Sequence, residues 1–240
     1  SSAASDVYKR QQKKQIEDGL EYIRKNPRGR DVVISGGDPL SNSDERLDYI
    51  MGSLRKIPHV EIFRLGTRNL VTLPHRITDD LLRILKDHAP VYVHTHYNHH
   101  RELTAEAFHV CEKIAMTGSP INNQMVLMKG INDDPEIVKR TNQILLMMRV
   151  RPYYLFQCDM SQGISHFRTP IEKGLEIIEN LRGHTSGMAV PHYVVDAPGG
   201  GGKIPLIPNY VVKNEGEKVT LRNYKNKEYV YPQPTPEVGK

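Results

Sequence analysis

The stretch Asp31-Val-Val-Ile-Ser-Gly-Gly-Asp-Pro39 decides the fold, because an apolar strand-like run ends in it directly at two glycines. A helical pattern, with apolar residues at i, i+3 and i+4, follows from Asp44 to Ile57. Glycine tolerates positive φ and lets a ligand approach the backbone closely. A strand, a glycine turn and a helix in this order predict a βα unit with a ligand-capable turn at the carboxyl end of its strand. Taken alone, the turn is equally compatible with a tight bend that binds nothing.

The same alternation of strand-like and helical runs repeats along the chain, and several of the helical runs open with an Asp or Thr cap. Such regular alternation favours parallel βαβ units in an open sheet or a barrel. We expect strands at Asp31–Ser35, Val60–Leu65, Val91–His94, Ile121–Met128 and Pro152–Gln157, and helices at Asp44–Ile57, Thr78–His88, Thr104–Thr117, Asp134–Met148 and Ile171–Leu181.

The two ends depart from this pattern. Residues 1–11 resemble translated adapter sequence and contain no initiator Met, so we set them aside as a cloning or assembly scar and expect a helix from about Gln12 to Lys25. We expect one α/β domain over residues 12–209, close to the usual size of a (β/α) barrel. Residues 210–240 predict a C-terminal hairpin followed by a proline-rich tail from Pro232.

Composition excludes several classes of protein. The 240 residues carry a formal charge of +5, but the basic residues are scattered without interleaved aromatics, so nucleic-acid binding is not expected. No apolar run reaches the roughly eighteen residues of a membrane span, and no secretory leader is visible, so we expect a cytoplasmic protein. Cys111 and Cys158 lack a paired metal or redox spacing, and we expect both to be buried thiols.

The segment Asp196-Ala-Pro-Gly-Gly-Gly-Gly-Lys203 joins four glycines to one amine. It follows the strand-like run Tyr193-Val-Val195, so it is expected at the end of a strand, where α/β proteins bind ligands. A lysine in this setting can form an imine with a carbonyl cofactor, which makes Lys203 the candidate. A P-loop is disfavoured because Ala197 and Ile204 stand where that motif requires glycine and Ser or Thr. A flexible surface loop is the alternative.

Two further polar runs lie at strand ends. His94-Thr-His-Tyr-Asn-His-His100 could bind a metal through imidazole, but no carboxylate or cysteine accompanies it at a familiar spacing, so we favour a hydrogen-bonding role for His96. Asn122-Asn-Gln124 places three amides in one strand, where each needs a partner, and Gln124 is the candidate ligand contact.

Two carboxylates also close strands. Asp159 follows the Pro152–Cys158 run and Asp196 follows Tyr193–Val195. We expect the two to converge on one pocket, unless each caps its own loop.

Together these motifs resemble the lysine 2,3-aminomutases, radical S-adenosylmethionine (SAM) enzymes that also use pyridoxal phosphate. The resemblance extends from Asp31 to Val212. Its motifs are Ser35-Gly-Gly-Asp-Pro-Leu40, Thr95-His-Tyr-Asn98, Asn123-Gln124, Arg149-Val-Arg-Pro-Tyr-Tyr154, Gln157-Cys-Asp159, His166-Phe-Arg-Thr-Pro170, Leu181-Arg-Gly-His-Thr-Ser-Gly187 and Asp196 through Lys203.

The resemblance implies an α/β fold, a partial (β/α) radical SAM barrel that lacks its first strand and cluster loop, with a short C-terminal hairpin. It implies an isomerase that interconverts L-lysine and β-lysine by radical 2,3-migration of the amino group. The resemblance implies that Lys203 is the imine-forming lysine for pyridoxal phosphate, beside the loop Gly199, Gly200, Gly201 and Gly202. It implies that SAM is bound by Gly36, Gly37, His96 and Gln124. It implies that the ε-ammonium of L-lysine is bound by Asp159 and Asp196.

The resemblance also implies components beyond this chain. The cysteine loop that would hold the [4Fe–4S] cluster lies upstream in the family, so the chain alone is expected to be inactive and to hold no metal. A reducing donor such as flavodoxin or ferredoxin is implied, as is a homo-oligomer at full length. Some family members bind zinc between subunits, but Asp134 occupies the partner position here, and no zinc is expected.

Three alternatives stay open. The chain could belong to an aminomutase for arginine or glutamate, or to the branch that modifies elongation factor P. In the glutamate enzymes the positions of Asp159 and Asp196 are not both acidic, so this pair favours a cationic amino acid, and His166–Pro170 and Gly199–Lys203 favour the free-lysine branch. A non-catalytic pyridoxal phosphate-binding or scaffold protein is the alternative from another class.

Overall fold

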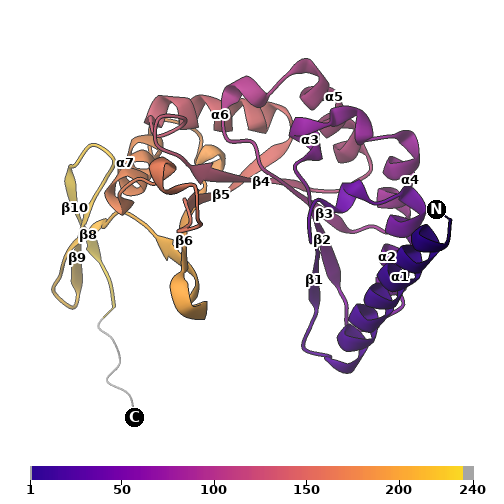
Figure 1. The fold of residues 1–240 in the computed structure, drawn as a ribbon. Coiled ribbons are helices and arrows are strands. Elements are labelled where there is room, and N and C mark those ends of the chain that lie inside the picture. The colour runs from indigo at the N-terminus through magenta and orange to yellow at the C-terminus, as the bar shows by residue number, and fades with distance from the viewer. Residues whose placement is uncertain (1, 235–240) are drawn as a thin grey trace, which may run out of the picture. The chain divides into compact units, whose positions relative to one another are not determined.

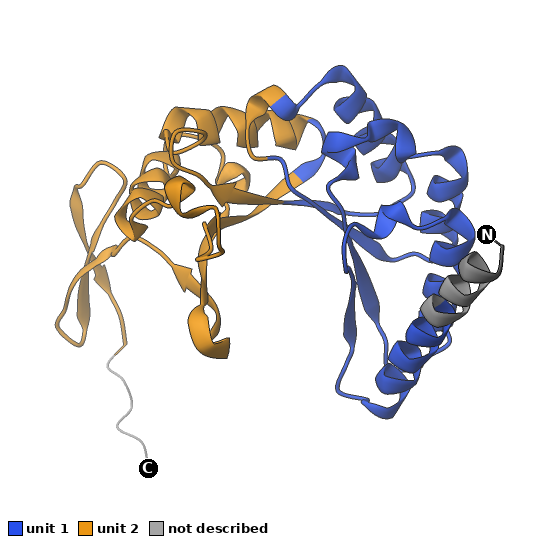
Figure 2. Cartoon of the chain, in the orientation of Figure 1, with its two compact units in different colours: residues 1–97, 102–123, 148–150 blue, residues 98–101, 124–147, 151–240 orange. Residues whose placement is uncertain are grey.

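The computed structural model describes residues 2–234, with side chains from residue 13 onward, and the chain falls into two compact units (Figure 2). Unit 1 consists of residues 1–97, 102–123 and 148–150, and unit 2 of residues 98–101, 124–147 and 151–240. None of the described helices is long and apolar enough to cross a bilayer.

Unit 1 alternates parallel strands with helices (Figure 1). Neighbouring strands pair in register, with Val33 opposite Arg64 and His94 opposite Asn122. Its strands are β1 (Asp31–Ile34), β2 (Ile62–Gly66), β3 (Val91–Thr95) and the start of β4 (Ile121–Leu127), and its helices are α1 (Ser2–Lys25), α2 (Asp44–Arg55), α3 (Asn69–Thr72), α4 (Asp79–Asp87) and α5 (Ala105–Met116).

The two faces of these strands differ. Phe63 and Leu65 on β2 are buried, and the guanidinium carbon of Arg55 on α2 lies 4.2 Å from the centre of the Phe63 ring, so this face is covered by helices. Side chains alternate across a strand, so Arg64 points to the opposite face. His94 of β3 and Asn122 of β4 stand on that same polar face.

Unit 2 contains the end of β4, then β5 (Val150–Gln157) from its second residue onward and β6 (His192–Ala197), which is parallel to β5. The antiparallel β7 (Gly202–Leu206) follows. Helices α6 (Pro135–Met147) and α7 (Ile171–Leu181) complete it. The apolar stripes of both helices meet the strands in one core, which consists of Met125, Leu127, Val138, Leu155, Ile177, Ile178, Leu181 and Tyr193.

The expected helix starts agree with the caps found. The side chains of Ser43, Thr78 and Thr104 each accept a hydrogen bond from the backbone amide three residues on, as N-caps do. The expected α/β class, with parallel strands between helices and an antiparallel C-terminal extension, is confirmed. Short 3₁₀ helices lie at η1 (Pro39–Ser41), η2 (Pro74–Arg76), η3 (His100–Glu102), η4 (Ser165–Phe167), η5 (Gly187–Ala189) and η6 (Pro198–Gly200).

Three details differ from the expectation. Helix α1 begins at Ser2 rather than near Gln12. The C-terminal extension has a third strand: β8 (Val211–Asn214) and β9 (Lys218–Arg222) form the expected hairpin, and β10 (Glu228–Pro232) adds to β9 because Tyr229-Val-Tyr231 suits a strand. The proline-rich tail was expected from Pro232, which ends β10, and residues 235–240 lie outside the described residues.

Candidate functional site

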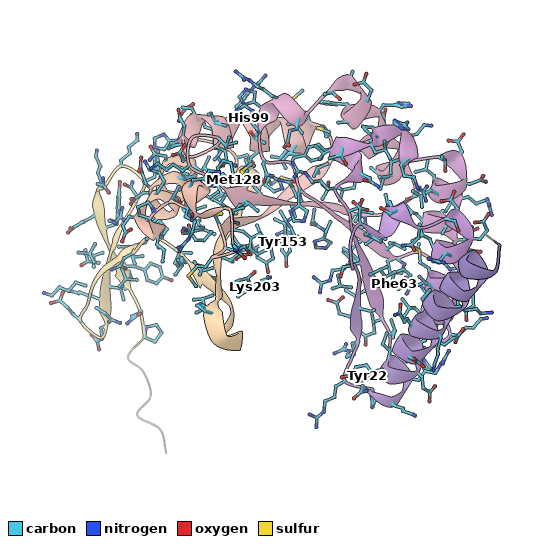
Figure 3. The ribbon with its side chains drawn as sticks, viewed as in Figure 1. Tyr22, Phe63, His99, Met128, Tyr153 and Lys203 are labelled. Atoms are coloured by element: carbon cyan, nitrogen blue, oxygen red, sulfur yellow. The ribbon has the colours of Figure 1, made fainter. Side chains whose placement is uncertain are left out.

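The glycine-rich segment forms a β-hairpin rather than a free loop. Strand β6 pairs antiparallel with β7, and Asp196 stands directly opposite Lys203. Lys203 is labelled in Figure 3. Pro205 has no backbone N–H to donate. It is tolerated because β7 is the last strand in the order of its sheet and pairs on one side only, with β6. The lysine is therefore fixed on a strand at a defined register.

The Lys203 amine has two partners. Its Nζ donates to Oδ1 of Asp196 at 2.8 Å and to Oδ2 at 3.0 Å, and it lies 4.6 Å from the centre of the Phe156 ring. The Lys203 and Asp196 side chains are 46% and 40% exposed, so the amine remains accessible to a small molecule.

The backbone conformation of the turn between β6 and β7 explains why it is built of glycines. Gly199, Gly200 and Gly202 have φ values of 70°, 81° and 75°, a region that side chains other than glycine rarely adopt. Open space surrounds these three positions, whereas a Cβ at Gly201 would come within 2.8 Å of the Ala197 Cβ. The hairpin thus turns tightly and leaves room beside its backbone.

A pocket of about 600 Å³ opens beside the hairpin, within unit 2. Asp159 follows β5 and Asp196 lies on β6, and both line it. The other lining residues are Gln157, Cys158, Met160, Ser161, Arg168, Thr169, Pro170, Ile171, Val195 and Pro198.

A buried polar relay ties the walls of this pocket together. The Tyr193 hydroxyl donates to Oε1 of Gln157 at 2.7 Å, and Nε2 of Gln157 donates to the Thr169 carbonyl at 2.6 Å. Burial raises the pKa of Tyr193 to about 12, so the hydroxyl stays protonated and able to donate. The ring fits because residue 174 is glycine, where a Cβ would come within 2.1 Å of the ring.

Sequence reasoning passed over Arg168 and Thr169 as site residues. They belong to the His166–Pro170 motif, which was used only for the resemblance. The signal that would have placed them was the position of this motif between two strand ends, since both residues line the pocket.

The glycine turn after β1 lies in unit 1. Gly36 and Gly37 have φ values of 99° and 66°, so glycine is required there. Asp38 fixes the turn: its carboxylate accepts from the Thr67 hydroxyl at 2.7 and 2.9 Å and from the Arg68 amide at 2.7 Å. Its Oδ1 also accepts a hydrogen bond from the Leu40 amide, so the Asp38 carboxylate stabilises this turn.

One amide of the Asn122-Asn-Gln124 run is bonded to the backbone that follows His96. The Asn123 side chain accepts from the Tyr97 amide at 2.7 Å and donates to the Tyr97 carbonyl at 2.9 Å, which accounts for one of the three amides and orders the backbone after His96. Gly36, Gly37 and His96 belong to unit 1, and Gln124 belongs to unit 2.

His94 is a buried neutral imidazole. Burial, and then the positive charge of Arg64, lower its pKa to about 4. Among the residues that the structure describes, no group of three or more His, Cys, Asp or Glu side chains is placed to hold a metal ion.

The expectation that both thiols are buried is confirmed. Burial raises the pKa of Cys111 to about 11 and that of Cys158 above its usual range, so neither is a ready thiolate. The sequence has two cysteines, whereas four cysteine thiolates hold a [4Fe–4S] cluster, so the cysteines of this chain do not fit one. The accessible amine of Lys203, by contrast, fits a carbonyl cofactor such as pyridoxal phosphate, and the positive-φ turn at Gly36–Gly37 fits a ligand close to the backbone.

Comparison with known proteins shows what this chain is similar to. A family model described as lysine-2,3-aminomutase matches residues 178–239, which include the hairpin. An L-lysine 2,3-aminomutase of Methanococcus maripaludis is 55% identical over 212 residues, 88% of this chain and 49% of that protein. One of Fusobacterium nucleatum is 53% identical over 91% of this chain and 52% of that protein.

A relative with another name is almost as similar. A glutamate 2,3-aminomutase of Clostridioides difficile is 50% identical over 88% of this chain and 50% of that protein. The chain spans about half the length of the curated relatives it matches. Over the part of those proteins that it spans, the chain is a homologue of the lysine 2,3-aminomutases.

Proposed function

We propose that this chain is part of an isomerase that moves the amino group of L-lysine from C2 to C3, giving β-lysine. The observation that carries the proposal is the Lys203–Asp196 pair at the 600 Å³ pocket that Asp159 also lines. The amine, which is able to attach a carbonyl cofactor, contacts Asp196, and Asp196 and Asp159 line one pocket as carboxylates able to hold a substrate cation.

Lys203 is the proposed attachment point for pyridoxal phosphate. Bound there, that cofactor supplies a conjugated system that stabilises a radical next to the migrating nitrogen. The β6–β7 register holds Nζ in place, and the turn Gly199–Gly202 leaves open space beside the backbone.

Asp159 and Asp196 are the proposed partners of the substrate's side-chain ammonium. In the present structure the Lys203 ammonium contacts both oxygens of Asp196, which shows that the carboxylate accepts an ammonium with good geometry. Asp159 has no ion-pair partner in the part of the chain that the structure describes. Two carboxylates favour a cationic side chain and disfavour that of glutamate.

Further parts of the proposal concern the whole protein. Gly36, Gly37, His96 and Gln124 are the proposed SAM contacts. We also propose an external reductant such as flavodoxin or ferredoxin and a homo-oligomeric state, both from the family resemblance. A cytoplasmic location is proposed from the sequence composition.

The first experiment maps cofactor attachment. The chain is incubated with pyridoxal phosphate, reduced with borohydride, digested and analysed by mass spectrometry. We expect the label on Lys203, and its loss in Lys203→Arg, while the matched variant Lys213→Arg, at an exposed lysine paired with Glu215, keeps it. A label spread evenly over the exposed lysines would contradict the attachment site.

The second experiment compares substrates. We expect L-lysine to bind more tightly than L-glutamate, and Asp159→Asn to weaken lysine binding about tenfold. Tighter binding of glutamate would instead favour the function named for the Clostridioides difficile relative. Attachment at Lys203 without β-lysine formation by the complete protein would favour a non-catalytic binding protein.

A further inference from the structure

The Asp196 carboxylate has one hydrogen-bonding partner within residues 13–234, and that partner is the Lys203 ammonium. Nζ donates to Oδ1 at 2.8 Å and to Oδ2 at 3.0 Å, so a single ammonium uses both oxygens. Lys203 likewise has no second acceptor in this part of the chain, and the antiparallel register sets the two residues opposite each other. Each charge therefore neutralises the other for as long as Lys203 carries its ammonium.

The same carboxylate also belongs to the pocket beside the hairpin. Asp196 contributes to the wall of this 600 Å³ pocket, whereas Lys203 is not among the residues that line it. A cation that enters the pocket therefore meets Asp159, and an Asp196 that is already neutralised by an amine from outside the wall. Arg168 lines the pocket as well, but a guanidinium keeps its charge in every state of Lys203. The state of Lys203 thus decides how many carboxylates the pocket offers to a cation.

Imine formation at Lys203 removes the amine as a competitor for this carboxylate. The lysine nitrogen forms a double bond to the carbonyl carbon, the carbonyl oxygen leaves as water with two of the ammonium protons, and the third proton passes to solvent. A neutral imine nitrogen has no N–H left to donate, so both oxygens of Asp196 are released. The two side chains are 46% and 40% exposed, which leaves the pair accessible to small reactants.

We propose that Asp196 couples two binding events, so that a carbonyl compound at Lys203 and an ammonium in the pocket each strengthen the binding of the other. An ammonium in the pocket takes the carboxylate from Lys203 and leaves that amine able to react. Coupling between two sites is reciprocal, so attachment at Lys203 strengthens cation binding by the same factor. Because the pair is about half exposed, that factor is small, about threefold. The inference rests on the proposed function for the identity of the two ligands, pyridoxal phosphate and L-lysine.

The test measures imine formation with simple probes in the full 240-residue chain. Propanal supplies the carbonyl group, cyanoborohydride traps the imine, and mass spectrometry gives the labelling rate of each lysine at one fixed pH. Trimethylammonium supplies the cation, because a tertiary ammonium donates a hydrogen bond but cannot form an imine, and sodium chloride at equal ionic strength is its control. The variants are Asp196→Asn and Asp159→Asn. The matched control is Glu215→Gln, which removes the carboxylate partner of Lys213, another exposed lysine, outside this pocket.

We expect Asp196→Asn to raise the labelling rate of Lys203 about threefold, because the amine is no longer held in an ion pair. Saturating trimethylammonium should raise the wild-type rate at Lys203 by the same factor, about threefold. Its effect should be smaller in Asp159→Asn, which removes the second carboxylate of the pocket, and absent in Asp196→Asn. Glu215→Gln should leave both the labelling rate of Lys203 and its response to trimethylammonium unchanged.

Two outcomes overturn the coupling: a labelling rate at Lys203 that does not rise in Asp196→Asn, or a response of the wild type to trimethylammonium that is no greater than its response to sodium chloride. Failure of the proposed function is a different result. In that case pyridoxal phosphate does not attach at Lys203, while the labelling of Lys203 by propanal still depends on Asp196 and on trimethylammonium.

Discussion

Asp196 and Lys203 are direct cross-strand partners on β6 and β7, and both carboxylate oxygens contact the amine, at 2.8 and 3.0 Å. If Lys203 attaches a carbonyl cofactor, its free ammonium is replaced by an imine nitrogen, and this carboxylate becomes available to another ammonium. Under the proposed function, the same Asp196 therefore serves the free protein as a lysine partner and the loaded protein as a substrate partner.

The first prediction separates stability from binding at Asp196. The pair is about half exposed, so Asp196→Asn should change the free energy of unfolding by no more than about 1 kcal/mol. Lysine affinity should fall about tenfold, since a charge-assisted contact is lost. Urea unfolding and calorimetry measure the two effects. A large loss of stability with unchanged affinity would make the pair structural.

A second prediction concerns the contact between α7 and β6. A Cβ at residue 174 would approach the Tyr193 ring to 2.1 Å, and the buried ring has no room to retreat. Gly174→Ala should therefore lower the free energy of unfolding by about 1–3 kcal/mol. Gly19→Ala is the matched helical control: its Cβ meets nothing within 4 Å, so it should stabilise by about 0.5–1 kcal/mol. Equal effects of the two substitutions would contradict the packing argument.

The sequence predicted the elements well where local signals were strong. Apolar periodicity, with Thr78 and Thr104 as caps, placed α2, α4, α5, α6 and α7 within two residues of their observed ends. Helix α1 instead begins well before the expected Gln12. Local sequence did not predict strand β7, because Lys203-Ile-Pro-Leu206 is short and contains a proline. Its strand state comes from pairing with β6, which is a tertiary effect.

For the candidate site, the expectation that Asp159 and Asp196 line one pocket agrees with the structure, whereas the other residues of the pocket wall were missed. Asp159, Asp196 and Lys203 stand at strand ends that motifs mark. Tyr193 and Gln157 join across 36 residues of sequence, and no local pattern encodes that contact. The Thr169 hydroxyl has no hydrogen-bond partner among the described residues, and this too is visible only in the folded structure.

The third prediction tests the relay that fixes the pocket wall. Tyr193→Phe keeps the ring but leaves Oε1 of Gln157 without this donor, which should cost about 1–3 kcal/mol of stability. Lysine affinity should fall as well, because Gln157 holds the Thr169 carbonyl. Tyr97→Phe is the control, since it removes a buried hydroxyl that donates to the Leu70 carbonyl in unit 1. It should lower stability and leave lysine affinity unchanged; an equal loss of affinity in both variants would count against the relay.

The fourth prediction is a pH dependence from His94. Its pKa is about 4 in the folded protein, because of burial and the charge of Arg64, against about 6.5 in an unfolded chain. Between these values the unfolded state binds more protons than the folded state. Stability is therefore greatest above pH 6.5 and falls as the pH drops toward 4.

The expected loss from this single group is about 2 kcal/mol between pH 8 and pH 5. Unfolding titrations of wild type and His94→Gln over this range measure it, because the variant retains every other titrating group. The variant's stability should decline less steeply toward pH 5 by about that amount. Parallel curves would mean that the imidazole protonates equally in both states, and the polar face of β3 would then have to be open to solvent rather than closed around His94.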